Sequence, residues 1–176
     1  YNTLADLNQS NLGTLANTSY NTGGISYIIE NKIFVYFDGD MANFDRQIIA
    51  GLYKIVMQEA MKNSRFAEIL NNSETVNDWF TDGLAAYFSK SWDSKTDNEF
   101  RNILEGTKLK NIKDIDGKYA AIAGQSLWKY IADNYGKNVP LEIFSDAVRS
   151  KNYYDSFKSA TGLEFKDLNK AWLNYY

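Results

Sequence analysis

The sequence predicts an α+β fold that is mostly helical, with a small N-terminal β-sheet packed on a long helix and a C-terminal helical bundle. Two short apolar runs at residues 25–29 and 33–37 are rich in β-branched and aromatic residues, which favours strands. Residues 41–62 then carry apolar side chains at steps of three and four, which is the helix period. From residue 78 to residue 175, one helical segment follows another.

The N-terminal elements follow from local signals. A short helix is expected from Thr3 to Asn11, followed by a loop rich in Asn, Thr, Ser and Gly. The runs from Ile25 to Ile29 and from Ile33 to Phe37 are separated by a short polar turn, so they should pair as a hairpin. Asp40 stands directly before the long helix, where its carboxylate can cap the first turn.

The segment 41–62 is predicted to be a core helix. Its expected buried face is formed by five apolar residues at helical spacing: Phe44, Ile48, Leu52, Ile55 and Val56.

Further helices are expected downstream. Their predicted ranges are 66–70, 78–89, 98–105, 119–135, 141–149, 154–161 and 164–175. Gly136 and Gly162 follow the ends of two of these segments, and Pro140 stands where a helix can begin.

Composition narrows the class of protein. The chain has 176 residues, 44% of them hydrophobic, and one domain spanning residues 1–176 is expected. A net charge of -3 gives no basic surface for nucleic acid, and no apolar run is long enough for a membrane span. The first residue is Tyr1 rather than Met, so we expect the chain to be a fragment of a longer protein.

The chain contains neither cysteine nor histidine. Without cysteine there are no disulfides, thiolate metal ligands or cysteine nucleophiles. Without histidine there is no Ser-His-Asp mechanism and no H-E-x-x-H zinc site, because each needs an imidazole. Carboxylate, lysine, tyrosine and hydroxyl groups remain for any chemistry.

One stretch carries a family resemblance. Residues 79–87 read Trp-Phe-Thr-Asp-Gly-Leu-Ala-Ala-Tyr, which resembles the W-[FL]-x-E-G-[LIF]-A-x-Y signature of the peptidase-MA-like (gluzincin) metallopeptidases. In that family an H-E-x-x-H helix supplies two zinc ligands one turn apart, and the Glu of this signature supplies the third. The fold that the resemblance implies is gluzincin metallopeptidase-like.

The resemblance extends over nearly the whole chain. The further segments that carry it are Tyr1-Asn2 with Asp6, residues 9–11, Gly23-Gly24, residues 31–36, Gly39-Asp40, Trp92-Asp93 and residues 124–132. Together they resemble a branch found in large envelope proteins of Bacteroidetes, ahead of a TolB-type β-propeller. The resemblance therefore implies an extracytoplasmic location, in the periplasm or at the outer membrane, and a β-propeller in the same polypeptide as a candidate partner.

The residues at the expected zinc site depart from the family. Aligning the chain without a gap places Ala50, Gly51 and Lys54 at the first ligand, the general base and the second ligand, and Asp82 at the third ligand. The first three cannot perform those roles, so the resemblance implies a pseudopeptidase with a degenerate H-E-x-x-H motif, no zinc and no cofactor.

A second register also loses the imidazoles. It places Gln58, Glu59 and Lys62 at the same three positions, which keeps only the glutamate. We favour the first register, in which Lys54 is predicted to pair with Asp82 and to supply the charge of the missing metal. The alternative is that Lys54 is a solvated helix position.

Three classes of function remain open. The preferred one is a catalytically inactive protein- or peptide-binding module, with a possible edge strand formed by Ile33, Phe34, Val35, Tyr36 and Phe37. The same strand is alternatively covered by its own chain. The competing classes are a hydrolase using paired carboxylates, drawn from Glu59, Glu68, Glu74 and Asp82, and a structural spacer.

Overall fold

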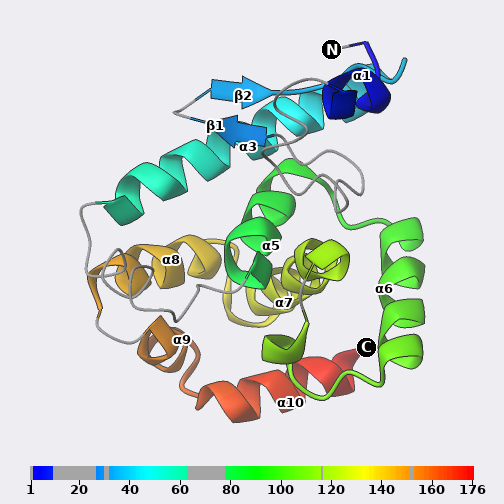
Figure 1. Ribbon diagram of the computed structural model, residues 1–176. Helices are drawn as coiled ribbons and strands as arrows, with labels where there is room; N and C mark the ends of the chain where they lie inside the picture. Colours follow the sequence, from blue (N-terminus) through cyan, green and yellow to red (C-terminus); the bar gives the residue numbers. More distant parts are fainter. Residues whose placement is uncertain (1, 10–26, 30–31, 63–77, 116, 151–152) are drawn as a thin grey trace.

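A two-stranded hairpin and the long helix α3 form one end of the molecule, and the other long helices gather around α5 and α7 (Figure 1). The computed structural model describes residues 2–9, 27–29, 32–62, 78–115, 117–150 and 153–176. Its elements are α1 (Leu4–Gln9), β1 (Tyr27–Ile29), β2 (Lys32–Phe34), α3 (Met41–Lys62), α5 (Asp78–Ser89), α6 (Ser94–Thr107), η2 (Ile112–Asp114), η3 (Gly117–Tyr119), α7 (Ala120–Tyr135), α8 (Val139–Arg149), α9 (Tyr153–Thr161) and α10 (Phe165–Tyr175). The prediction of a mostly helical chain with a small hairpin beside a long helix is confirmed.

The hairpin is shorter than predicted. β1 and β2 pair antiparallel with Ile28 opposite Ile33, and both strands contact α3. β2 starts at Lys32 and ends at Phe34, so the predicted strand from Ile33 to Phe37 is wrong at its C-terminal end. The start of the first predicted strand, residues 25 and 26, lies outside the described residues.

The strand stops because the main chain beyond it bonds to a side chain. The Gln47 carboxamide, from α3, accepts a hydrogen bond from the Tyr36 N–H at 3.1 Å and donates one to the Tyr36 C=O at 2.9 Å. Gln47 is fully buried. A single carboxamide thus satisfies both polar groups of one residue, as a neighbouring strand would.

The bounds of α3 agree with the predicted helix at residues 41–62. Asp40 caps it as expected, since its Oδ1 accepts a hydrogen bond from the Ala42 N–H at 2.8 Å. A turn precedes the cap, in which Gly39 has a φ of 93° and Asp38 Oδ1 accepts from the Asp40 N–H at 3.1 Å. The chain therefore leaves the hairpin through a glycine-dependent turn that leads directly into the helix.

The predicted buried face of α3 is wrong for two of its members. Leu52 is 53% exposed and Val56 is 64% exposed. The face turned to the rest of the molecule carries mainly small and polar residues and two methionines: Asn43, Gln47, Ala50, Gly51, Met57 and Met61. This face is selected because it brings a hydrogen-bonding side chain to Tyr36 and small residues close to α5.

Helices α5 and α7 cross at two glycines. A Cβ atom on Gly124 would lie 2.7 Å from the Cα of Gly83, and one on Gly83 would lie 2.9 Å from the Gln125 nitrogen. Both distances are shorter than real contacts of a side chain allow, so the two backbones touch. The Gln125 side chain also donates to the Lys90 C=O at 2.8 Å, just after the last turn of α5.

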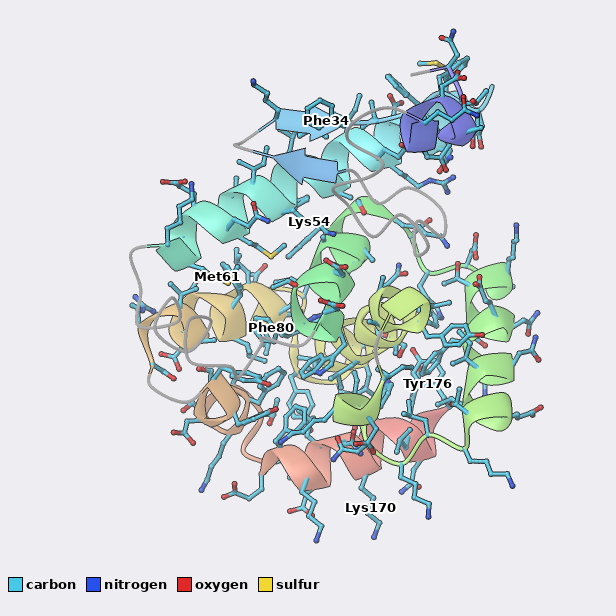
Figure 2. All side chains as sticks on the ribbon, viewed as in Figure 1. Phe34, Lys54, Met61, Phe80, Lys170 and Tyr176 are labelled. Atoms are coloured by element: carbon cyan, nitrogen blue, oxygen red, sulfur yellow. The ribbon has the colours of Figure 1, made fainter. Side chains whose placement is uncertain are left out.

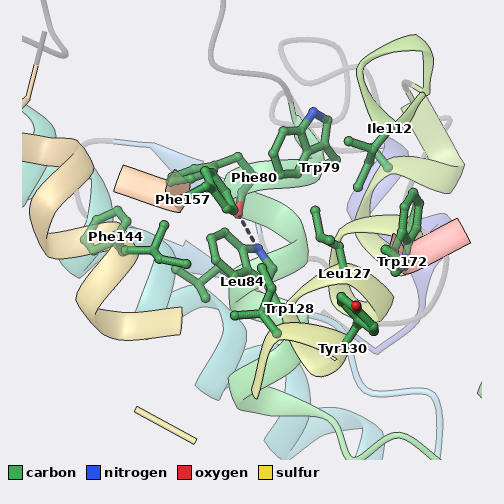
Figure 3. Close-up of a cluster of buried hydrophobic side chains, with 14 of the residues drawn as sticks. Trp79, Phe80, Leu84, Ile112, Leu127, Trp128, Tyr130, Phe144, Phe157 and Trp172 are labelled. Atoms are coloured by element: carbon green, nitrogen blue, oxygen red, sulfur yellow. Dashed lines mark hydrogen bonds between the residues drawn. The ribbon is translucent and has the colours of Figure 1, made fainter. Parts of the chain in front are cut away.

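An aromatic cluster lies beside this crossing (Figure 3). Trp79, Phe80, Trp128 and Phe157 have no exposed area. The Phe80 and Trp128 rings meet edge to face at 5.3 Å, and the Trp128 indole N–H donates to the Phe80 C=O at 3.1 Å. Burial of each such side chain contributes roughly 1.5–3 kcal/mol or more to folding. Trp79 and Phe80, at the start of the motif at residues 79–87, therefore belong to the core.

The later helices lie close to their predicted positions. Gly136 and Gly162 follow α7 and α9 with φ of 127° and 74°, and Pro140 stands in the first turn of α8. Helix α6 is longer than the predicted 98–105, because Asp93 caps an earlier start at residue 94. The predicted helix at 66–70 lies outside the described residues.

Candidate functional site

An ion pair joins α3 to α5 at the position where the sequence led us to expect a degenerate metal site. Lys54 Nζ lies 2.6 Å from Asp82 Oδ1. The two side chains are 15% and 24% exposed, so the pair is mostly shielded from water. Lys54 extends from the underside of α3 toward α5 (Figure 2). The predicted pairing of these two residues is confirmed, and the alternative of a solvated lysine is wrong.

The other two residues of the first register share the face that carries Lys54. Ala50 lies one helical turn before Lys54 and is 7% exposed, and Gly51 is buried. Because side chains four apart stand above one another on a helix, positions 50 and 54 both face α5. The structure thus brings Ala50, Gly51, Lys54 and Asp82 into one region between the two helices.

The second register lies away from this region. Gln58, Glu59 and Lys62 are exposed, and Lys62 Nζ pairs with Glu59 Oε2 at 2.7 Å on the surface of α3. A carboxylate engaged in this way is not directed at Asp82. The three residues of the second register therefore lie apart from the contact between Lys54 and Asp82.

An aromatic contact also joins α3 to α5. Tyr53 of α3 stacks on Phe88 of α5 with ring centroids 4.8 Å apart, and Phe88 meets Tyr87 edge to face at 5.1 Å. Sequence reasoning missed this contact, although Tyr53 directly precedes Lys54. In the sequence Tyr53 stands next to Lys54, but Phe88 lies six residues after Asp82, so no local pattern indicated the contact.

Two tyrosines, one on α5 and one just after β2, have raised pKa values. Burial, followed by the negative charge of Asp133, raises the pKa of Tyr87. Burial, followed by Asp38, likewise raises the pKa of Tyr36 on the hairpin side of α3. A raised pKa keeps a phenol protonated to higher pH, because burial disfavours the charged phenolate.

The charges at the site neutralise each other. The Lys54 ammonium and the Asp82 carboxylate pair with each other, so the contact between the two helices carries no net charge. Within the ranges that the structure describes, no three His, Cys, Asp or Glu side chains gather closely enough to hold a metal ion. Electrostatically, the lysine provides the positive charge that a bound cation would provide to Asp82.

The predicted peptide-binding edge is reduced to the three residues of β2. Ile33 and Phe34 belong to that strand, whereas Val35, Tyr36 and Phe37 do not. The Tyr36 main chain is already bonded to Gln47, so a partner strand cannot extend past it. Of the predicted edge strand and the residue before it, the described residues place Lys32–Phe34 in β2.

Comparison with known proteins gives no relative. No protein-family model, no curated protein and no solved structure matches this chain. In the part of the chain that the structure describes, no helix is both long and apolar enough to cross a membrane.

Proposed function

We propose that this chain is a catalytically inactive domain of the peptidase-MA-like (gluzincin) type, which acts as a protein- or peptide-binding or assembly module in a bacterial envelope protein. The observation that carries the proposal is the ion pair between Lys54 and Asp82. It lies between the two helices to which the resemblance assigns the zinc ligands. An extracytoplasmic location and a β-propeller partner in the same polypeptide belong to the same proposal.

Loss of a bound metal ion leaves its carboxylate ligand without a positive partner. A carboxylate that once bound zinc would be unpaired and partly buried once the metal is gone, which costs several kcal/mol in a low-dielectric surrounding. A lysine one helix away removes this cost without changing the packing. Ala50 and Gly51 then fill the remaining positions with small side chains that demand no polar partner.

Restoring the ligands tests the correspondence of positions. The variant combining Ala50→His, Lys54→His and Asp82→Glu should bind one zinc ion, because two imidazoles one turn apart and a carboxylate from α5 make a three-ligand site. The matched control combines Gln58→His, Lys62→His and Asp82→Glu. We expect calorimetry to show binding at least 100-fold tighter in the first variant than in the control.

Each outcome has a defined meaning. Zinc binding by neither variant would contradict the proposed ancestry, and tighter binding by the control would favour the second register. Stoichiometric zinc in the unaltered chain, or peptide hydrolysis by it, would contradict an inactive domain. A separate measurement concerns binding: hydrogen exchange at residues 32–34 should slow when the β-propeller region of the full polypeptide is added.

The hydrolase alternative has less support. Asp82 is paired with Lys54, and Glu59 is on the exposed side of α3, paired with Lys62. Two convergent carboxylates, the requirement for such chemistry, are therefore not formed by these two residues. Glu68 and Glu74 lie outside the described residues.

A further inference from the structure

We propose that a groove along α6 binds an extended peptide segment. The groove encloses about 930 Å³ and follows α6 from Ser94 to Thr107, with Tyr119 of η3 also lining it. None of its described lining residues belongs to the α3–α5 site. The proposal therefore does not depend on the resemblance to peptidases or on the zinc experiment.

The base of the groove is apolar and unfilled. Ile103 is buried at 8% exposure and, like the Tyr119 ring, packs against the core of the domain. Gly106 leaves open space, since a Cβ atom built there would meet no other atom within 4 Å. A bound chain can place apolar side chains here without displacing any described group.

The wall of the groove offers two carboxamides, those of Asn98 and Asn102. Both residues are exposed, and no hydrogen bond between described residues uses either side-chain amide. Residues four apart on a helix are separated by about 6 Å along its axis. Peptide groups that point to the same side of an extended chain recur about every 6.6 Å, so the two amides can meet alternate peptide groups.

The molecule already uses carboxamides in this way twice. Gln47 bonds both the N–H and the C=O of Tyr36. Asn169 of α10 donates to the Lys110 C=O and accepts from the Ile112 N–H, each at 3.0 Å, across an extended residue. A carboxamide carries one acceptor and one donor group, which matches a peptide backbone. Asn98 and Asn102 present the same chemistry to a chain from outside.

The charges along the groove select among peptides. Lys95 and Glu99 lie one helical turn apart on the same side, and the ion pairs of the described residues do not include one between them. Because the two charges cancel, the groove does not favour a polyanion. It is complementary to a segment that carries an acidic and a basic residue two positions apart, since both then point to the same wall.

The test uses the whole chain and a displayed library of random 12-residue peptides. Selected peptides, made synthetically, are titrated against the unaltered chain and two groove variants. Gly106→Tyr fills the open space, and Asn98→Ala with Asn102→Ala removes the amides. The control is Glu105→Ala, an exposed α6 residue that is not among those lining the groove. We expect affinity to fall at least ten-fold in both groove variants and to stay unchanged in the control.

Other results would overturn the proposal. These are failure to select any peptide, binding that is insensitive to both groove variants, and binding of neutral oligosaccharides in place of peptides. Thermal unfolding of each variant separates lost binding from lost folding, and Gly106→Tyr is expected to keep the fold because its site is open. A peptide that instead slows hydrogen exchange at residues 32–34 would locate binding at β2, which supports the proposed function and not the groove.

Discussion

Gly83 and Gly124 face each other where α5 crosses α7, with room for a hydrogen atom on each and for nothing larger. A Cβ on Gly124 would lie 2.7 Å from the Cα of Gly83 and 2.8 Å from the Trp79 carbonyl carbon. The obstructing atoms belong to backbone, which cannot turn aside as a flexible side chain can. This close approach is what allows the large rings of Phe80 and Trp128 to meet beside the crossing.

Replacing either glycine should separate the two helices. We expect Gly83→Ala and Gly124→Ala each to lower the free energy of unfolding by about 3 kcal/mol, because overpacked backbone contacts must be relieved by moving a helix. Urea unfolding followed by circular dichroism measures this. Gly106→Ala is the matched control, and it should be neutral or stabilising by about 0.5–1 kcal/mol since its site is open and helical. Equal effects at all three positions would contradict the close crossing.

Breaking the ion pair from one side should cost more than removing it entirely. Lys54→Met leaves the Asp82 carboxylate without a counter-charge in a mostly shielded position, and Asp82→Asn does the reverse to the ammonium. We expect each to destabilise by about 1–2 kcal/mol, a value reduced for the residual exposure of both groups. The double variant Lys54→Met/Asp82→Asn should lose less than the sum of the two single losses. Additive losses in this cycle would mean that the two charges do not interact.

The Gln47 carboxamide should protect one particular amide. Gln47→Leu leaves the Tyr36 N–H and C=O without partners in a buried position, at a cost of about 2–4 kcal/mol. Amide hydrogen exchange at Tyr36 should accelerate while the amides of α7 remain protected. Gln58→Leu, on the exposed side of the same helix, should change stability by about 0.5 kcal/mol or less. Unchanged exchange at Tyr36 in Gln47→Leu would count against the two bonds.

The cap of α6 should make stability depend on pH in the acid range. The hydrogen bond from the Thr96 N–H is the main reason that the pKa of Asp93 is lowered. A lowered folded-state pKa means that the charge stabilises above the ordinary aspartate range, near about 4, and that this stabilisation is lost as the pH falls through the folded-state value. Asn also caps helices. The difference in unfolding free energy between the unaltered chain and Asp93→Asn should therefore shrink from pH 7 to pH 3, and a constant difference would contradict it.

Local signals predicted the boundaries of the helices well. The Asp40 cap, the glycines after α7 and α9 and the start of α8 near Pro140 each depend on one or two neighbouring residues. The Lys54–Asp82 contact was predicted because the family resemblance places residues 54 and 82 at neighbouring positions on two helices, and the two side chains carry opposite charges. Each of these features depends on a few residues and not on the packing of the whole core.

The buried face of α3 and the start of α6 could not be predicted from apolar periodicity. The buried face of α3 is determined by Gln47 meeting Tyr36 and by small residues meeting α5, which outweigh the apolar Leu52 and Val56. Helix periodicity identifies which residues share a face, but not which face another element will cover. The early start of α6 was missed because its first turn is polar, so the apolar pattern begins only after the Asp93 cap.

Both charges that join α3 to α5 belong to the polypeptide itself. Where a structural metal holds two helices together, a chelator that removes the metal separates the helices. Such a protein also folds only when the metal is present. The Lys54–Asp82 pair instead forms whenever the chain folds, and dissolved salt screens it only weakly because both side chains are mostly shielded from water. Attachment of the long helix is thus constitutive, and it depends on neither metal supply nor a chelator.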